Sequence, residues 1–268
     1  MLGVIGGSGL YSIPEVESRE LITPFGKPSS KIYIYQDRIA FIARHSENHT
    51  FPPHKVPYKA NLWALKTLGV DRILAISAVG AIDESLNIGQ IVVPEDIINF
   101  SIHETFYDGI ALEVEGEDIP ASLIREGAVV HVDCTDIYCF YMRESIKNIL
   151  QELKADFKMG GIYACTYGPR FETPAEIMAL EKLGASIVGM TSGPEATLAR
   201  ELGLCYANIS IVTNLAAGKS KSKLTTTEVI EVVSQKLSLI KEVIFKMADD
   251  FGYKSCDCGK YLQEARVG

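Results

Sequence analysis

Residues 188–214 read VGMTSGPEATLARELGLCYANISIVTN. This stretch predicts an apolar strand over 187–189, a helix over 195–202 that Gly203 closes, and a β-branched strand over 206–213. Glycine just after the last helical residue commonly ends a helix, because it adopts the left-handed conformation without strain. A strand, a helix and a further strand in succession favour a parallel sheet that is covered by helices.

The same alternation continues on both sides of this unit. Apolar and β-branched runs predict further strands at 2–5, 31–35, 38–43, 72–77, 90–94 and 160–165. Helical spacing of apolar residues predicts helices at 59–67, 138–153, 173–183 and 226–251. The polar stretch 218–227 is predicted to be a loop, with a lid as one use. We expect an α/β fold in a single domain, 1–268, with a central mixed, mostly parallel sheet flanked by helices.

Composition excludes several classes of protein. The 268 residues are 47% hydrophobic and carry a net charge of −8, which suits a large core and predicts no nucleic-acid surface. The N-terminus lacks the charged and apolar regions of a signal peptide, and no apolar run reaches the roughly 18 residues of a membrane span. We therefore expect a cytoplasmic protein without nucleic-acid or membrane partners.

Cysteine and histidine spacing predicts no metal site. Four of the six cysteines stand singly in apolar surroundings and are interpreted as small core residues: Cys134, Cys139, Cys165 and Cys205. Cys256 and Cys258 form a C-x-C pair that is redox-capable, although two thiolates make an incomplete zinc site. His49 and His54 lack a carboxylate or thiolate at ligand spacing.

Two segments suit an anion. The loop Gly6-Gly7-Ser8-Gly9 offers backbone N–H groups and the Ser8 hydroxyl, although a simple turn explains it equally well. A dinucleotide loop is disfavoured, because Ser12 stands where a third glycine is needed and strands follow. Arg44-His45 ends a strand, where a guanidinium can grip phosphate bidentately; the alternative is a surface arginine beside a core histidine.

A third segment, GPRFETPAEI at 168–177, suits a purine. Phe171 offers a face for stacking, and the Glu172 carboxylate can accept from N1–H of a 6-oxopurine. The amide of Asn214 can donate to O6 or N7. Adenine presents a lone pair at N1, which would face the carboxylate of Glu172. A buried polar mismatch of this kind favours the 6-oxopurine over adenine by a factor of roughly 10⁴. The plainer alternatives are a core aromatic at Phe171 and a helix N-terminal charge at Glu172.

Five segments together resemble the trimeric-type family of purine nucleoside phosphorylases and methylthioadenosine phosphorylases. They are GVIGGSGLY (3–11), ARHSENHT (43–50), ISAVGAI (76–82), YGPRFETPAEI (167–177) and the stretch 188–214. The resemblance covers nearly the whole chain. It implies a homotrimer or a dimer of trimers, inorganic phosphate as co-substrate, and neither a metal nor an organic cofactor.

The resemblance also implies site residues. The phosphate site corresponds to Ser8, Arg44, His45, Ser77, Ala78 and Thr191. The nucleoside site corresponds to Phe171, Glu172, Met190, Asn214, Leu215, Ala216, Thr226 and Val229, with His131 lent by a neighbouring subunit. The expected catalytic residues are Asn214, Glu172 and His45. This chain departs from the methylthioadenosine branch in the base pocket. That branch carries an Asp-x-Asp sequence where this chain, after Thr213, has Asn214-Leu215-Ala216, which suits a 6-oxopurine.

The predicted function is phosphorolysis of inosine and guanosine to the free base and ribose 1-phosphate, in purine salvage. Thr226 and Val229 suit either a 5′-hydroxyl or a 5′-methylthio group, so S-methyl-5′-thioinosine phosphorolysis is the alternative, ahead of methylthioadenosine phosphorolysis. A nucleoside hydrolase would need no Arg44 and no phosphate. A non-catalytic purine-binding protein would bind guanosine without cleaving it.

Overall fold

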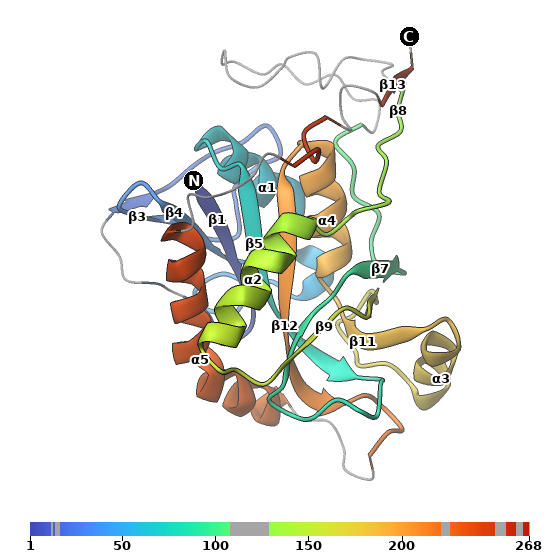
Figure 1. Ribbon diagram of the computed structural model, residues 1–268. Helices are drawn as coiled ribbons and strands as arrows, with labels where there is room; N and C mark the ends of the chain where they lie inside the picture. The colour runs from blue at the N-terminus through green and yellow to red at the C-terminus, as the bar shows by residue number, and fades with distance from the viewer. Residues whose placement is uncertain are drawn as a thin grey trace.

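Two long buried strands, β5 (Arg72–Ala81) and β12 (Cys205–Leu215), form the centre of the molecule and pair in parallel (Figure 1). The structure is a computed structural model that describes residues 1–11, 13, 17–107, 129–220, 226–249, 256–260 and 265–267, with only the backbone at 129, 226, 266 and 267. Both central strands are rich in β-branched and small apolar residues, which is typical of strands covered on both faces.

Further strands extend the sheet on both sides. They are β1 (Leu2–Gly6), β2 (Glu17–Arg19), β3 (Ile32–Tyr35), β4 (Ile39–Ala43), β6 (Ile91–Val93), β7 (Asp96–Asn99), β9 (Phe157–Met159), β10 (Ile162–Cys165) and β11 (Ala185–Gly189). Among the described residues this sheet has eleven strands in the order β2-β3-β4-β1-β5-β11-β10-β7, with β12, β6 and β9 branching from β5. A separate two-stranded sheet pairs β8 (Val129–Val130) with β13 (Arg266–Val267).

Most of the pairings in the large sheet are parallel. Parallel ladders join β1 to β4 and β5, β5 to β12, β10 to β7 and β11, and β6 to β9. The ladders β2–β3, β3–β4, β5–β11 and β6–β12 are antiparallel. The predicted mixed, mostly parallel sheet is therefore confirmed. The two predicted strands at 31–35 and 38–43 pair as an antiparallel hairpin.

Helices cover both faces of the sheet (Figure 1). On one face lie α2 (Phe140–Glu152) and α5 (Thr226–Asp249), whose apolar side chains share a core cluster with β1, β5 and β12. On the other lie α1 (Tyr58–Thr67) and α4 (Ser192–Glu201), which pack around the buried Trp63. The short α3 (Pro174–Lys182) packs beside β11, and η1 (Pro53–Lys55) is a single 3₁₀ turn.

Several element boundaries differ from the prediction. β5 continues to Ala81, so residues 77–80 lie inside a strand and not at its end. The five strands β2, β7, β8, β9 and β13 were not predicted, because each has at most four residues and such runs carry too little pattern. The predicted loop at 218–227 falls partly on 221–225, outside the described residues.

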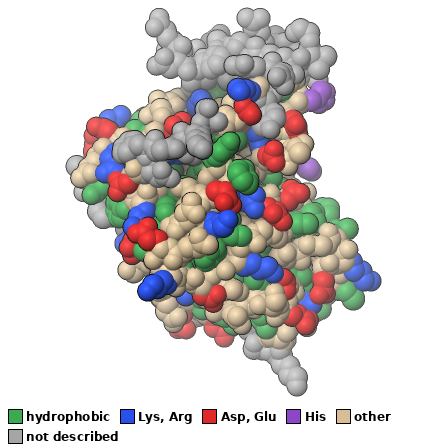
Figure 2. All heavy atoms as spheres, viewed as in Figure 1, with side chains coloured by type: hydrophobic (Ala, Val, Ile, Leu, Met, Phe, Trp, Pro, Cys, Tyr) green, Lys and Arg blue, Asp and Glu red, His purple; other side chains and the backbone are tan. Residues whose placement is uncertain are grey.

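The visible surface carries mixed charge. In Figure 2, Lys and Arg side chains are interspersed with Asp and Glu over the face shown. Within the described ranges, no helix is long and apolar enough to cross a membrane.

Candidate active site

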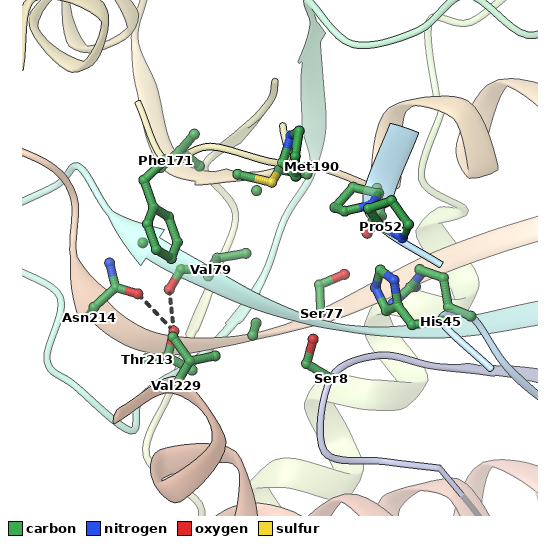
Figure 3. Close-up of a pocket in the computed structure, with 18 of the residues that line it drawn as sticks. Ser8, His45, Pro52, Ser77, Val79, Phe171, Met190, Thr213, Asn214 and Val229 are labelled. Carbon is green, nitrogen blue, oxygen red and sulfur yellow. Dashed lines mark hydrogen bonds between the residues drawn. The ribbon is translucent and has the colours of Figure 1, made fainter. Parts of the chain in front are cut away.

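A cavity of about 370 Å³ opens beside β5, close to where β1 and β4 end. Open α/β sheets bind ligands at the carboxyl ends of such strands. Most of the predicted site residues line it: Ser8, Arg44, His45, Ser77, Ala78, Phe171, Glu172, Met190, Thr191, Asn214, Ala216 and Val229. Figure 3 shows Ser8, Ser77 and His45 at one end and Phe171 and Asn214 at the other.

We call these two regions the serine end (Ser8, Arg44, His45, Ser77 and Thr191) and the aromatic end (Phe171, Glu172 and Asn214).

Arg44 is the most deeply buried charge of the serine end, at 1% exposure. Its Nε donates to Oε1 of Glu195 at 2.5 Å, its Nη2 to Oε2 of the same carboxylate at 2.9 Å, and its Nη1 to the Ile76 carbonyl at 2.8 Å. Burial acts to lower the pKa of Arg44, but the Glu195 carboxylate outweighs it and the pKa lies above its ordinary value. Arg44 and Glu195 therefore form a buried pair of opposite charges.

This pairing changes the role predicted for Arg44. Its guanidinium fork was predicted to grip phosphate, whereas the fork holds Glu195. A guanidinium has five N–H groups, so one N–H on each Nη atom remains for a ligand. Gly7 permits this packing, because a Cβ there would lie 2.8 Å from Nη1 of Arg44 and 2.4 Å from the Ile76 carbonyl oxygen.

His45 is neutral at the serine end. Its Nδ1 lies 2.7 Å from the Phe51 carbonyl oxygen, and because a carbonyl only accepts, Nδ1 carries the proton. Burial, helped by the Arg44 charge, lowers the pKa of His45 to about 3. Nε2 is thus left as an acceptor. A hydrogen bond between Nε2 of His45 and a ligand would therefore be one that the imidazole accepts.

Ser77 is held by a buried chain of polar side chains. Nδ2 of Asn208 donates to the Ser77 hydroxyl oxygen at 2.8 Å, and Ser210 donates to Oδ1 of Asn208 at 2.7 Å. All three are buried. Because the Ser77 oxygen accepts from Asn208, its own proton is left for another acceptor, and Ser77 lines the cavity.

The aromatic end begins in the loop before α3. Thr173 caps this helix in a capping box with Glu176, and Arg170 donates to both carboxylate oxygens of Glu176 at 2.8 and 2.7 Å. The Arg170 guanidinium holds the pKa of Glu176 down at about 2. These contacts fix the loop on either side of Phe171 and Glu172, so that the ring and the carboxylate both reach the cavity.

Glu172 is oriented by a neighbour on the strand side. The Thr166 hydroxyl donates to its Oε1 at 2.5 Å. This bond leaves Oε2 of Glu172, together with the remaining lone pair of Oε1, for a donor inside the cavity.

A β-bulge aims Asn214 at the cavity. The ladder between β12 and β5 shifts register between Val212 and Asn214, which leaves Thr213 as the extra residue. Thr213 donates to Oδ1 of Asn214 at 2.9 Å, and Nδ2 of Asn214 donates to the Leu215 carbonyl at 2.9 Å (Figure 3 draws the first contact). Because the Leu215 carbonyl can only accept, the amide must present its nitrogen there. Its orientation, which the sequence left open, is thereby set.

Three predicted site residues lie elsewhere or are not described. Leu215 does not line the cavity: side chains alternate along a strand, and it packs against the cluster of Val79 and Val212. His131 is exposed beside β8 and its N–H donates to the Ala265 carbonyl, so it does not contribute to the cavity of its own chain. The side chain of Thr226 lies outside the described residues.

Sequence reasoning missed several supporting residues. Glu195 stands in the quoted stretch GPEA, and its pairing with Arg44 had no signal beyond a carboxylate in an apolar helix. Thr166 follows one predicted strand and Thr213 ends another, and only the fold reveals their hydrogen bonds. His49 and residues 50–53 line the cavity because the chain turns back after Arg44.

The cysteines follow the prediction in part. Cys139 and Cys205 are buried in the core, as predicted. They are not isolated, however: they lie beside Cys256 and Cys258, and the four sulfurs are within 4.8 Å of one another. Cys165 is buried as expected, whereas Cys134 is exposed. In the described part of the chain, this is the one group of three or more potential metal ligands.

Comparisons with known proteins show the family of this chain. The sequence profile of the phosphorylase superfamily matches residues 1–248. A probable 6-oxopurine nucleoside phosphorylase from Thermococcus kodakarensis is 44% identical, with 98% of each chain covered. A probable S-methyl-5′-thioinosine phosphorylase from Methanothermobacter thermautotrophicus is 42% identical, with 100% of this chain and 90% of the relative covered. Methylthioadenosine phosphorylase from Schistosoma mansoni in complex with adenine superimposes with a TM-score of 0.87 at 28% identity, over 99% of this chain and 98% of that one. The chain therefore belongs to the phosphorylase superfamily.

Proposed function

We propose that this protein catalyses the phosphorolysis of 6-oxopurine nucleosides, inosine and guanosine, to the free base and ribose 1-phosphate. One observation carries the proposal: a single cavity joins hydroxyls and a buried arginine at its serine end to a ring, a carboxylate and an amide at its aromatic end. The relatives named 6-oxopurine nucleoside phosphorylase support the same reaction.

Phosphate is proposed to bind at the serine end. The donors are the Ser8, Ser77 and Thr191 hydroxyls and the two remaining N–H groups of Arg44, with Ala78 forming the adjacent wall. From there a phosphate oxygen attacks C1′ while the bond to the base breaks. The sugar gains positive charge in this transition state, and the phosphate dianion stabilises it electrostatically.

The purine is proposed to bind at the aromatic end. Phe171 stacks on the base, Glu172 accepts from N1–H, and the second N–H of the Asn214 amide donates to O6 or N7. These contacts stabilise the purine anion as it leaves. Met190 and Ala216 pack around the nucleoside, and Met190 fits against Gly168, where a Cβ would lie 2.6 Å from its Sδ.

A second candidate substrate is S-methyl-5′-thioinosine. Val229, at the start of α5, presents an apolar side chain to the cavity, which suits a thioether better than a hydroxyl. Relatives at 42% identity carry that name as well. The base and phosphate contacts would be the same for both substrates.

Initial rates with and without phosphate test the proposal. We expect inosine, guanosine and S-methyl-5′-thioinosine to be cleaved only when phosphate is present, and adenosine to be slower by a factor of roughly 10⁴ in kcat/KM. Equal turnover without phosphate would identify a hydrolase. Binding of guanosine without cleavage would identify a non-catalytic purine-binding protein.

We propose a homotrimer or a dimer of trimers, because Phe100, Tyr167 and Leu183, each more than half exposed, border a second hollow that shares Glu172 with the cavity. Light scattering after size exclusion measures the mass of the oligomer directly.

Phosphate is proposed to be the only co-substrate, without metal or organic cofactor in the reaction, so added divalent cations should leave kcat unchanged.

We also propose that the enzyme serves purine salvage in the cytoplasm. The proposed product, ribose 1-phosphate, is a charged ester that does not cross membranes unaided, so its users must share the compartment. Fractionation of the source cells checks the location, with inosine phosphorolysis in each fraction as the readout.

A further inference from the structure

Four cysteines from three distant parts of the chain meet at one point, outside the cavity. Cys139 immediately precedes α2, Cys205 begins β12, and Cys256 and Cys258 belong to the segment 256–260. Their sulfurs all lie within 4.8 Å of one another, and those of Cys205 and Cys256 are 3.1 Å apart.

The spacing of these sulfurs suits a tetrahedral metal ion. With Zn–S bonds of about 2.3 Å, the sulfurs of a tetrathiolate site lie roughly 3.8 Å from one another. The observed cluster matches this arrangement after a small opening of the Cys205–Cys256 contact. Cys139, Cys205 and Cys258 are buried and Cys256 is half-buried, as in closed structural sites that leave no coordination position to solvent.

The segment that carries the C-x-C pair has few other anchors among the described residues. Residues 256–260 form a turn closed by the Lys260 N–H and the Asp257 carbonyl at 2.8 Å, with neither helix nor strand. Its residues Asp257, Gly259 and Lys260 are exposed. The cysteines are thus the part of this segment that enters the core, beside α5 and the start of β12.

We infer that Cys139, Cys205, Cys256 and Cys258 bind one structural Zn²⁺ ion. Binding replaces four S–H bonds by four Zn–S bonds and releases the thiol protons to solvent, without oxidation or reduction. The ion ties the C-terminal segment to α2 and β12.

Metal content of the purified full-length chain is the primary test, measured by mass spectrometry of the elements after purification with a thiol reductant and without chelator. We expect about one zinc per chain. Co²⁺ supplied in place of zinc should give the visible d–d bands and the thiolate charge-transfer bands of a tetrahedral sulfur site. The substitution C258S should reduce bound zinc at least about tenfold and lower the melting temperature.

The matched control is C134S, which changes an exposed cysteine that is not part of the cluster. It should keep both zinc and melting temperature. If C258S does not fold, the zinc content of C256S and the Co²⁺ spectrum of the unaltered chain provide the test instead. The inference is overturned if the unaltered chain holds no zinc. Alkylation of a second preparation, made without reductant, before and after reduction then shows whether the four cysteines form two disulfides. Equal zinc content in C258S and the unaltered chain would overturn the inference too.

Discussion

The two ends of the cavity are built in different ways. At the serine end, Arg44, His45 and Ser77 are buried. Each is held by a hydrogen-bond partner, which lies on helix α4 for Arg44, on the loop after β4 for His45 and on strand β12 for Ser77. At the aromatic end, Phe171 is 41% exposed, and Glu172 is positioned by a loop and one threonine. The end proposed for the shared co-substrate is thus part of the core, while the end proposed for base selection can change without disturbing the sheet.

Removing Arg44 should therefore have the largest effect. Arg44→Ala leaves the buried Glu195 carboxylate without its partner, and a broken buried pair costs about 3–5 kcal/mol of unfolding free energy. Urea unfolding measures this loss, and steady-state kinetics should show a phosphate KM raised far more than the inosine KM. The matched change at the other end, Phe171→Ala, should lower the unfolding free energy by less than about 1 kcal/mol. Equal losses in the two variants would contradict the difference in construction.

Glu172→Gln should show the reverse balance. The amide cannot accept from N1–H in the same way, so we expect kcat/KM for inosine to fall by about 100-fold. Because Glu172 is only partly buried, the unfolding free energy should change by less than about 0.5 kcal/mol. The ratio of inosine to adenosine kcat/KM is the measurement. Adding Asn214→Asp should move that ratio further toward adenosine. An unchanged ratio in the double variant would refute the proposed hydrogen bonds of Glu172 and Asn214 with the purine.

The protonation of His45 gives a smaller effect with a defined sign. Its pKa of about 3 in the folded chain lies below the ordinary value near 6.5, so only the unfolded chain takes up this proton between those values. Stability from His45 is therefore present above pH 6.5 and lost as the pH falls toward 3. Between pH 7.5 and 5 the loss is about 2 kcal/mol. Urea unfolding at both pH values should show this loss of unfolding free energy in the unaltered chain but not in His45→Gln. The same dependence on pH in both proteins would refute the assignment of the loss to His45.

The smallest effect is expected at Val229. Val229→Thr introduces a hydroxyl where an apolar side chain now lines the cavity. We expect the preference for S-methyl-5′-thioinosine over inosine to fall by about tenfold or less, the worth of one neutral hydrogen bond. Competition between the two nucleosides at equal concentration measures the ratio directly. A rise in the preference would place Val229 away from the 5′ group.

The sequence predicts the fold well because its long elements carry strong periodic patterns. The central β5 and β12 and the helices on both faces follow from apolar runs and from glycine or proline at their ends. Edge strands of two to four residues escape prediction, since their pairing is imposed by neighbours that are distant in the chain.

The candidate site is predictable in part for the same reason. Residues that end long strands, such as Arg44 and Asn214, could be named from the sequence. Their actual partners could not. Glu195 lies 151 residues from Arg44, and the bulge at Thr213 arises from the pairing of β12 with β5, so neither leaves a local pattern. The cysteine cluster is similar, because Cys205 and Cys256 lie 51 residues apart.

The Arg44–Glu195 pair also bears on how fast an anion reaches the cavity. Since the pair is neutral and His45 is uncharged, the serine end supplies little long-range attraction. The chain as a whole carries a net charge of −8 and repels a dianion at a distance. Salt screens that repulsion over a Debye length of about 8 Å at physiological ionic strength. Capture of phosphate should consequently become faster with added inert salt, the opposite of a site that draws its ligand in by a basic funnel.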